Sequence, residues 1–383
     1  MAIDWGQVRG EFPALADWTY LNTATYGQTP RCGVEAAERH FARRNTLACA
    51  DFLEWFDDAD RIRGGIARMI GCEAGDIAFF GNASSALSLL LGGMDWRAGD
   101  RVVTLEHEFP NNLYYPSLLG GRGVEFVETA WDGFYDAVTE RTRLVLLSSV
   151  NYTTGFRPPL DEVSKFLRGR GVMLYVDGTQ SVGALRMNVG ELRPAMMAVN
   201  AYKWMLSPNG AGFAYVAPEL RERLQPNVVG WRSHHEWRRV DSLHRGAPLF
   251  SGKAEKYEGG MLNFPSLYAM GAVVEMMEEL GGAGIEARVM ETAEALREVL
   301  RGQGGRLLCD AAPHYDSQIV TARWEGRDAS EIARELKKER VLVSARHGNL
   351  RVSVHFYNDR ADLERLGEAL GELVGGTRLR RGS

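Results

Sequence analysis

Short apolar runs alternate with helical patterns between about residues 60 and 220 of the chain. The runs are near-continuous, which is typical of buried strands in a largely parallel sheet that is covered on both faces. Helical patterns lie between them, as at Ser84–Leu91 and Leu160–Arg168. This alternation predicts an α/β layered domain. The predicted strands are Ile77–Phe80, Arg101–Leu105, Val124–Val127, Leu144–Leu147, Val172–Val176 and Phe213–Val216.

The pattern changes after about residue 256, where long helical patterns come first and short strands follow. Asp328, with Glu331 three positions on, is a capping signature for a helix that runs to Glu339, and Asp359 is expected to cap the last helix. These elements predict a smaller α+β domain. They comprise helices at Leu267–Leu280 and Ile285–Leu300 and strands at Gln318–Ala322 and Leu350–His355.

The length of 383 residues suits two or three domains of about 150 residues each. We expect residues 1–18 to form an N-terminal segment that packs with the small domain. Residues 19–256 are expected to form the large α/β domain and residues 257–383 the small α+β domain. The sequence has no internal repeat or low-complexity linker, so the two domains should pack closely.

Composition and charge exclude several classes of protein. With 25% charged residues and a net charge of -5, nothing favours binding to nucleic acid or to a membrane surface. No run reaches the roughly 18 apolar residues of a membrane span, and residues 1–5 lack signal-peptide features, so we expect a cytoplasmic protein. The four cysteines form no CxxC pair and the histidines show no metal spacing, so neither a disulfide nor a metal is expected. Arg378, Arg380 and Arg381 are interpreted as a solvated tail.

Loops after predicted strands carry the candidate chemistry, because ligands of open α/β sheets bind where strands end and helices begin. Ala83 and Ser84 follow one strand and start a helix, where free backbone N–H groups bind phosphate. Ser84 could instead be a plain N-cap. Phe109, in the loop Glu106–Asn112, stands where an aromatic side chain lies flat on a planar ring, unless it belongs to the core.

Asp177 ends an apolar strand, where a carboxylate is costly to bury without a partner. A protonated pyridinium nitrogen is a suitable partner, since its charge makes such a ring an electron sink. Gln180, three residues on, is placed to donate a hydrogen bond to the phenolic oxygen of the ring. The alternative is that Asp177 caps the next helix.

Lys203 stands between Tyr202 and Trp204 and precedes the glycine-rich turn Ser207–Phe213. A lone lysine is usually a surface charge. Its position 26 residues after Asp177, within an apolar setting, instead favours an amine with a lowered pKa that forms a Schiff base.

The motifs Asp177–Ser181 and Tyr202–Trp204 together resemble the class V aminotransferase family of pyridoxal-phosphate (PLP) enzymes with fold type I. The resemblance extends from Tyr20–Ala24 to Leu350–His355 and is nearest to the isopenicillin N epimerase-like and cysteine desulfurase-like branch. It implies a large domain with a mostly parallel seven-stranded sheet, a smaller α+β C-terminal domain, and a homodimer.

The resemblance also implies roles for individual residues. Lys203 is the Schiff-base lysine and Asp177 the pyridinium partner, while Arg351 pairs with a substrate carboxylate unless it is a surface strand residue. Asn22 lies in the substrate segment, and the family's ring-contacting asparagine falls on either Asn151 or Tyr152. The implied cofactor-binding residues are Ala83, Ser84, Phe109, Asp177, Gln180, Tyr202 and Lys203; the implied substrate-binding residues are Arg351, Asn22 and Tyr152.

Two departures from the family pattern limit the reaction. Cysteine desulfurases carry a thiol on a mobile loop before the carboxylate-binding arginine, whereas Val343–Asn349 has no cysteine. Cys309 is expected to be a packing residue, so desulfurase activity by the usual route is not expected. Met261 replaces a serine or threonine that reaches the cofactor phosphate across a dimer interface, which puts that contact in doubt.

We therefore expect a PLP enzyme that acts at the Cα of an amino acid, with aminotransferase-type chemistry as the leading interpretation. A C–S (cysteine-conjugate) lyase or an amino-acid epimerase is the alternative, because both would use the same residues. A non-catalytic PLP-binding module is the least favoured alternative. The loop Gly230–Arg239 is expected either near the entrance of the site or at a dimer contact.

Overall fold

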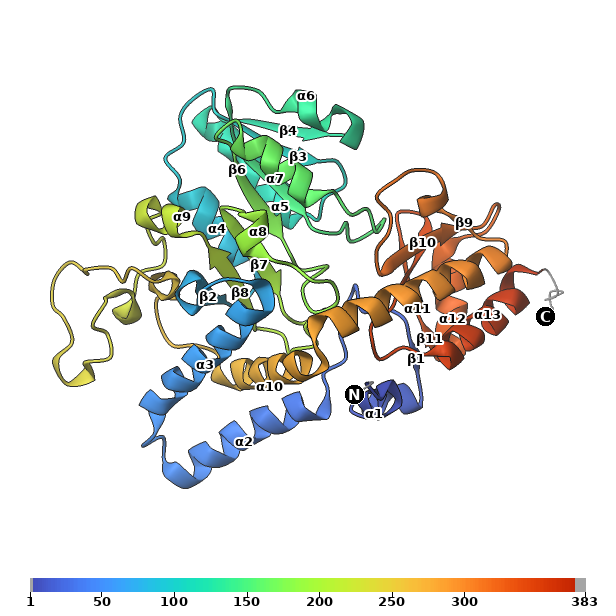
Figure 1. Cartoon of the computed structure of the whole chain (residues 1–383), viewed down its shortest axis with the longest axis horizontal. Helices are drawn as coiled ribbons and strands as arrows, with labels where there is room; N and C mark the ends of the chain where they lie inside the picture. Colours follow the sequence, from blue (N-terminus) through green and yellow to red (C-terminus); the bar gives the residue numbers. More distant parts are fainter. Residues whose placement is uncertain (1–2, 376–383) are drawn as a thin grey trace, which may run out of the picture.

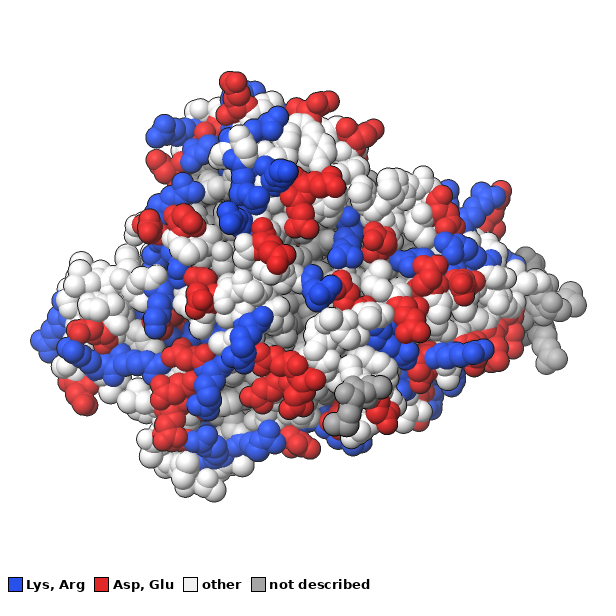
Figure 2. All heavy atoms as spheres, in the orientation of Figure 1, with Lys and Arg blue, Asp and Glu red and all other residues white. Residues whose placement is uncertain are grey.

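The computed structural model describes residues 3–375 and shows a large sheet and a small sheet, each flanked by helices (Figure 1). The predicted tail arginines Arg378, Arg380 and Arg381 lie outside the described residues. Of the helices within residues 3–375, none is both long and apolar enough to cross a membrane. Figure 2 shows acidic and basic side chains interspersed over the face drawn there.

The large sheet has seven strands in the order β2-β8-β7-β6-β5-β3-β4. Strands β7, β6, β5, β3 and β4 run parallel to one another, and β8 runs antiparallel to both β7 and β2. The predicted α/β class with a mostly parallel seven-stranded sheet is therefore confirmed. The strands are β2 Ile77–Phe80, β3 Arg101–Leu105, β4 Glu125–Thr129, β5 Thr142–Ser148, β6 Met173–Asp177, β7 Met196–Asn200 and β8 Gly212–Val216.

Helices cover both faces of this sheet, because its central strands are apolar along their whole length and buried. One group of three helices packs together, with α10 against α2 and α3. These are α2 Arg31–Leu47, α3 Phe52–Ile70 and α10 Phe264–Leu280. The other helices of this part are α4 Ala83–Gly93, α5 Asn111–Leu118, α6 Phe134–Ala137, α7 Leu160–Arg168, α8 Val189–Leu192 and α9 Pro218–Arg223.

The small sheet is antiparallel, with four strands in the order β12-β13-β10-β9. As predicted, Asp328 caps α12 and Asp359 caps α13, each through a side-chain oxygen that accepts backbone N–H groups. The strands are β9 Arg306–Leu307, β10 Ile319–Arg323, β12 Ser344–Arg346 and β13 Asn349–Ser353. The helices are α11 Gly282–Gly302, α12 Ala329–Lys338 and α13 Arg360–Val374.

The N-terminal segment contacts the C-terminal part of the chain. Arg9, at the end of α1 Trp5–Arg9, forms an ion pair of 2.8 Å with Asp362, and the ring of Phe12 lies 4.9 Å from that of Tyr357. Strand β1 Thr19–Tyr20 then pairs in parallel with β11 Val341–Leu342. The predicted domain boundaries at residues 18 and 256 stay a prediction.

Short 3-10 helices complete the described structure. They are Pro13–Ala16, Ala74–Asp76, Leu119–Arg122, Trp131–Gly133, Trp231–Ser233, Val240–Ser242, Ala254–Tyr257 and Leu308–Asp310.

Candidate active site

The predicted site residues come from loops at one edge of the large sheet, where parallel strands end. Asp177 is the last residue of β6, Lys203 follows β7, Phe109 follows β3, and α4 begins just after β2. Because the carboxyl ends of parallel strands share an edge, residues from distant parts of the chain meet there.

Lys203 is buried, with 7% of its surface exposed. Its Nζ lies 5.4 Å from the centroid of the Phe109 ring and 5.7 Å from that of Tyr202. Burial lowers the pKa of Lys203 to about 8; Asp177 opposes this shift, and Arg351 and Arg346 add to it. The amine therefore has the lowered pKa that the sequence predicts for a nucleophilic lysine.

Asp177 is fully enclosed in the large sheet. Its Oδ1 accepts a hydrogen bond of 3.0 Å from the N–H of Thr179, and burial raises the pKa of the carboxyl. Within residues 3–375 no basic side chain forms an ion pair with it. The next helix, α8, begins at Val189 and is capped by Asn188, so the alternative that Asp177 caps a helix is wrong.

Phe109 is 39% exposed, so the alternative that it is a core residue is wrong. The edge of Tyr152 meets its ring at 5.1 Å between centroids. The preceding residue points inward: Glu108 accepts hydrogen bonds from Ser148 and from the side chain of Asn112, and burial raises the pKa of its carboxyl. Glu108 was not predicted as a site residue, because its turn also holds Glu106 and His107 and nothing local marks the one carboxylate that is buried.

The N-terminus of α4 is exposed at Ser84. Asn82 is its N-cap and accepts the N–H of Ser85 at 2.9 Å, so the alternative of Ser84 as the N-cap is wrong. The N–H of Ala83 is bonded at 2.9 Å to the side chain of Asn200 at the end of β7. A methyl group built on Gly81 would meet nothing within 4 Å, so there is open space beside this turn.

Gln180 is held in place by both atoms of its amide. Its Oε1 accepts the indole N–H of Trp204 at 2.7 Å, and its Nε2 donates to the backbone oxygen of Ala24 at 3.1 Å. An amide nitrogen carries two N–H groups, so one remains for the predicted ring oxygen. Tyr202 packs against Tyr26 at 5.0 Å between ring centroids, and its predicted phosphate contact stays a prediction.

Arg351 is buried with 1% exposure, so the alternative of a surface strand arginine is wrong. Its Nη1 donates to the backbone oxygen of Tyr152, and its Nη2 donates to Thr25 Oγ1 at 2.5 Å and Asn22 Oδ1 at 3.4 Å. Its buried Nε has no partner within the described residues. Burial and the nearby Arg346 lower the pKa of Arg351 to about 9.

Asn151 and Tyr152 have different structural roles. The side-chain oxygen of Asn151 accepts the N–H groups of Thr153 and Thr154, and its Nδ2 donates to the backbone oxygen of His107. Asn151 therefore shapes the turn. Tyr152 contacts the ring of Phe109, as described above, and its hydroxyl lies 3.3 Å from His347 Nε2.

The hairpin between β12 and β13 closes with the two residues His347 and Gly348, both with positive φ of 47° and 76°. Such a two-residue turn is tight and leaves no room for a mobile loop. Cys309 lies elsewhere, at the 3-10 helix Leu308–Asp310, and burial raises the pKa of its thiol. The chain thus lacks a reactive thiol at the hairpin.

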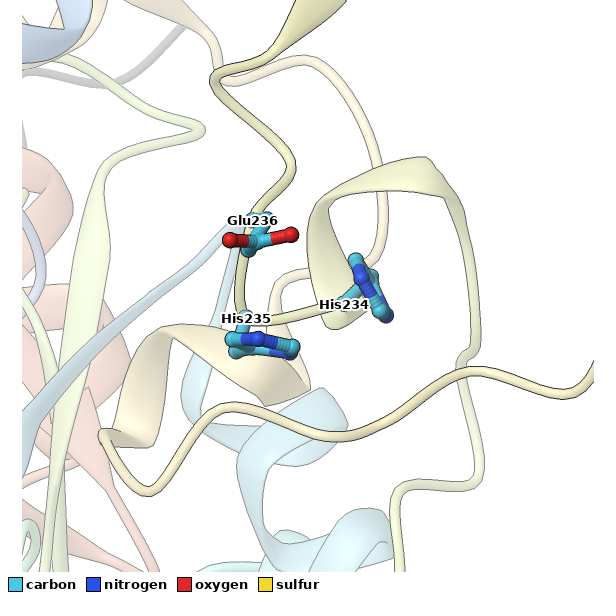
Figure 3. A group of neighbouring side chains, drawn as sticks. All are labelled: His234, His235 and Glu236. Carbon is cyan, nitrogen blue, oxygen red and sulfur yellow. The ribbon is translucent and has the colours of Figure 1, made fainter. Parts of the chain in front are cut away.

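Met261 is 57% exposed, and its predicted inability to reach a phosphate across a dimer stays a prediction. A further group, His234, His235 and Glu236, lies in the loop that projects from the large sheet on the side away from the small sheet (Figures 1 and 3). Their ligand atoms lie within 4.8 Å of one another. Glu236 is paired with Arg239, and His234 Nδ1 accepts the N–H of Leu249.

The arrangement at the sheet edge fits pyridoxal phosphate. The half-exposed Phe109 ring offers a stacking surface near the Lys203 amine. The buried carboxylate of Asp177 forms no ion pair among residues 3–375, although the charge of Lys203 acts to lower its pKa, so a pyridinium nitrogen could pair with it. The exposed start of α4 suits a phosphate.

Three comparisons with known proteins support a pyridoxal-phosphate enzyme. The family model described as Aminotransferase class-V matches residues 19–366. The chain is 26% identical over 397 residues to a probable cysteine desulfurase of Methanothermobacter thermautotrophicus, with 96% of this chain and 98% of that protein covered. It is 28% identical over 408 residues to isopenicillin N epimerase of Streptomyces clavuligerus, covering 97% and 99%. A solved C-DES mutant with glycine covalently linked to its PLP cofactor has the same fold, with a TM-score of 0.87 at 20% identity, covering 97% of this chain and 100% of that one.

Proposed function

Because the chain belongs to the class V aminotransferase family and is a PLP-dependent enzyme, we propose that Lys203 binds the cofactor and acts at the Cα of an amino acid. The observation that carries this proposal is the buried Lys203 amine, with its pKa near 8, beside the Phe109 ring. An amine with a pKa near 8 is about half neutral at pH 8, and this neutral form both attacks a carbonyl and accepts a proton.

Bound pyridoxal phosphate supplies an electron sink that makes the Cα–H bond acidic. The residues of the chain hold the ring so that this sink is effective. Asp177 would pair with the ring nitrogen and keep it protonated, Phe109 would offer a stacking surface, and Gln180 would donate its remaining N–H to the ring oxygen. The start of α4 would receive the phosphate at the exposed Ser84, whereas the N–H of the predicted Ala83 is already bonded to Asn200.

Arg351 and Asn22 orient the substrate. The guanidinium binds the α-carboxylate through its fork of N–H groups, and its unpartnered Nε is available for this contact. With the carboxylate fixed there, the Cα–H bond is directed toward Lys203, which removes the proton. Water is excluded because Arg351 and Lys203 are both buried.

We propose aminotransferase-type chemistry as the outcome. In that reaction Lys203 would take the proton from Cα and return it on the cofactor side, and a 2-oxo acid with the substrate's side chain would leave while the amino group stayed on the enzyme. Incubation of the purified protein with a panel of amino acids, one equivalent each, tests this. A stoichiometric 2-oxo acid that retains the side chain supports transamination. Release of pyruvate with a thiol, or of the opposite enantiomer, would reject it.

The second candidate, C–S lyase or epimerase chemistry, is favoured by Tyr152 and His347. Their hydrogen bond of 3.3 Å places a second proton carrier beside the Phe109 ring. Such a group could protonate a departing thiol or the second face of Cα. Tyr152→Phe separates the two functions, because transamination should continue at a similar rate, whereas elimination or epimerisation should fall about a hundredfold.

Persulfide chemistry, which the desulfurase relative's name suggests, is disfavoured by the two-residue hairpin without a cysteine. A non-catalytic cofactor-binding role is disfavoured by the intact set of Lys203, Asp177 and Arg351. Exchange of the Cα proton in heavy water, followed by NMR, decides the latter point. Exchange with at least one amino acid supports catalysis, and its absence with all of them supports the non-catalytic role.

We further propose a homodimer in the cytoplasm. Val228, Val229 and Met261 expose 54–59% of their surface, and Val228 lies beside Gly259, two residues before Met261. Exposed apolar side chains in one region of the surface are typical of subunit contacts. All four cysteines are free, which suits a reducing compartment. Light scattering coupled to size exclusion should give twice the chain mass of 42.6 kDa. A mass of one chain would reject the dimer.

A further inference from the structure

Two arginines at the site share one hydroxyl group. Thr25 Oγ1 accepts a hydrogen bond from Nη2 of Arg351 at 2.5 Å and from Nη2 of Arg346 at 3.5 Å. Arg346 ends β12 and Arg351 lies within β13, so the small sheet presents both guanidinium groups at the same point. Thr25, in the N-terminal segment, connects them.

Neither guanidinium has a counter-charge from the protein. Across residues 3–375, no aspartate or glutamate forms an ion pair with Arg346 or Arg351, although arginines elsewhere on this chain are widely paired. The positive charge of Arg346 lowers the pKa values of both Arg351 and Lys203. Like charges that share one hydroxyl group repel in a partly buried setting, so a bound anion would stabilise the arrangement.

The charges of the proposed complex can be matched one by one. Asp177 balances the ring nitrogen, and the start of α4 receives the phosphate. The α-carboxylate of the substrate balances Arg351, which leaves Arg346 without an anion. We propose that the substrate is an amino acid with an acidic side chain, and that Arg346 binds its second carboxylate. This inference rests on the proposed function, because it assigns the α-carboxylate to Arg351.

Arg346 is well placed for this role. It is half-buried, whereas Arg351 is fully buried, so it lies nearer the solvent, where a side-chain group would reach. Its Nη1 donates to the backbone oxygen of Ala345 at 2.7 Å, and a guanidinium has five N–H groups, so several remain for a carboxylate. The tight turn at His347 and Gly348 fixes the end of β12 and hence the base of the Arg346 side chain.

The test uses acids that lack an amino group and are not converted. Calorimetry of the cofactor-loaded protein compares succinate with its monoamide succinamate, and glutarate with glutaramate. In each pair one carboxylate is replaced by a neutral group of the same shape. A charged contact of this kind predicts that the wild type binds at least one diacid about tenfold more tightly than its amide.

Arg346→Gln should abolish this preference and leave the affinity for the amide within about twofold of the wild-type value. Arg334→Gln, the same change on the exposed face of α12, is the control and should keep the preference. Equal binding of diacid and amide by the wild type in both pairs would overturn the proposal. So would an equal loss of both affinities in Arg346→Gln, because the two arginines would then bind one carboxylate together.

A failure of the proposed function can be told apart from a failure of the inference about the substrate. The visible absorbance of the bound cofactor is recorded on the same samples. If this absorbance is present and the wild type shows no preference for a diacid, the proposed substrate class is wrong, while the proposed cofactor role of Lys203 stands. If wild-type protein reconstituted with pyridoxal phosphate lacks it, the proposed function fails and the inference fails with it.

Discussion

Nη1 of Arg351 donates a hydrogen bond of 2.6 Å to the backbone oxygen of Tyr152. This contact joins the small sheet to the turn that follows β5 in the large sheet. Since the ring of Tyr152 also meets that of Phe109, the predicted carboxylate-binding arginine and the predicted ring-stacking residue belong to one connected structure. The proposed substrate site and the proposed cofactor site therefore depend on the same contacts.

Arg351→Gln should weaken amino-acid binding by about tenfold to a hundredfold, because a charged two-pronged contact is lost. Arg351→Lys should recover a small part of the loss, since an ammonium group keeps the charge without the fork. Titration with an amino acid, followed through the cofactor absorbance, measures the affinity of both variants. Unchanged affinity in Arg351→Gln would mean that the carboxylate binds elsewhere.

Gly27→Ala should displace the backbone of Lys203. Gly27 donates its N–H to the backbone oxygen of Tyr202 at 2.9 Å, and a methyl group there would collide with the backbone oxygen of Lys203. We expect a loss of about 1–3 kcal/mol in the free energy of unfolding and slower cofactor incorporation. Gly302→Ala is the control, because a methyl group at that position meets nothing within 4 Å. Equal thermal stability of the two variants would contradict the close approach.

Cofactor incorporation should depend on pH through Lys203. Because the neutral amine is the nucleophile and its pKa is about 8, the rate with the apoprotein should rise about tenfold per pH unit below pH 8 and level off above it. An ordinary lysine, with a pKa of 10.5, would give a rate that still climbs at pH 9. Stopped-flow absorbance measures the profile, and a continued climb would show that burial does not lower the pKa.

Asp177→Asn should separate cofactor binding from proton removal. The amide keeps the shape but no longer holds the ring nitrogen protonated, so Cα proton exchange should fall about a hundredfold. The apoprotein should not lose stability at pH 7, because burial raises the pKa of the Asp177 carboxyl and its charged form is unfavourable in the fold. NMR exchange and thermal unfolding check the two parts. Exchange at the wild-type rate would remove Asp177 from the proposed role.

Much of the large sheet could be predicted from the sequence. Its strands are apolar along their length, and Ile77–Phe80 and Arg101–Leu105 were predicted with the bounds that the structure has. The family and the cofactor class were also predicted and are confirmed by the family match. Helix α2 was not predicted, because it buries little more than Gly33, Ala36 and His40 and has no strong apolar stripe.

The contacts around the site were harder to predict, because they join residues far apart in the chain. Thr25 and Arg351 are separated by 326 positions, and Ala83 and Asn200 by 117. Arg346 stands in the segment Val343–Asn349, and nothing local in the sequence shows that its guanidinium shares a hydroxyl group with that of Arg351. Such pairs become visible only in the folded chain, because they join residues that are distant in the sequence or that face each other across a hairpin.

The most direct test of the account is to locate the cofactor. Borohydride reduction of the cofactor-loaded protein fixes the bond between cofactor and amine, and peptide mass spectrometry then finds the modified residue. We predict one modified lysine, Lys203, and no covalent label in Lys203→Ala, while Lys256→Ala, which removes another buried lysine, keeps the label. Label on another lysine, or equal labelling of Lys203→Ala, would contradict the central claim.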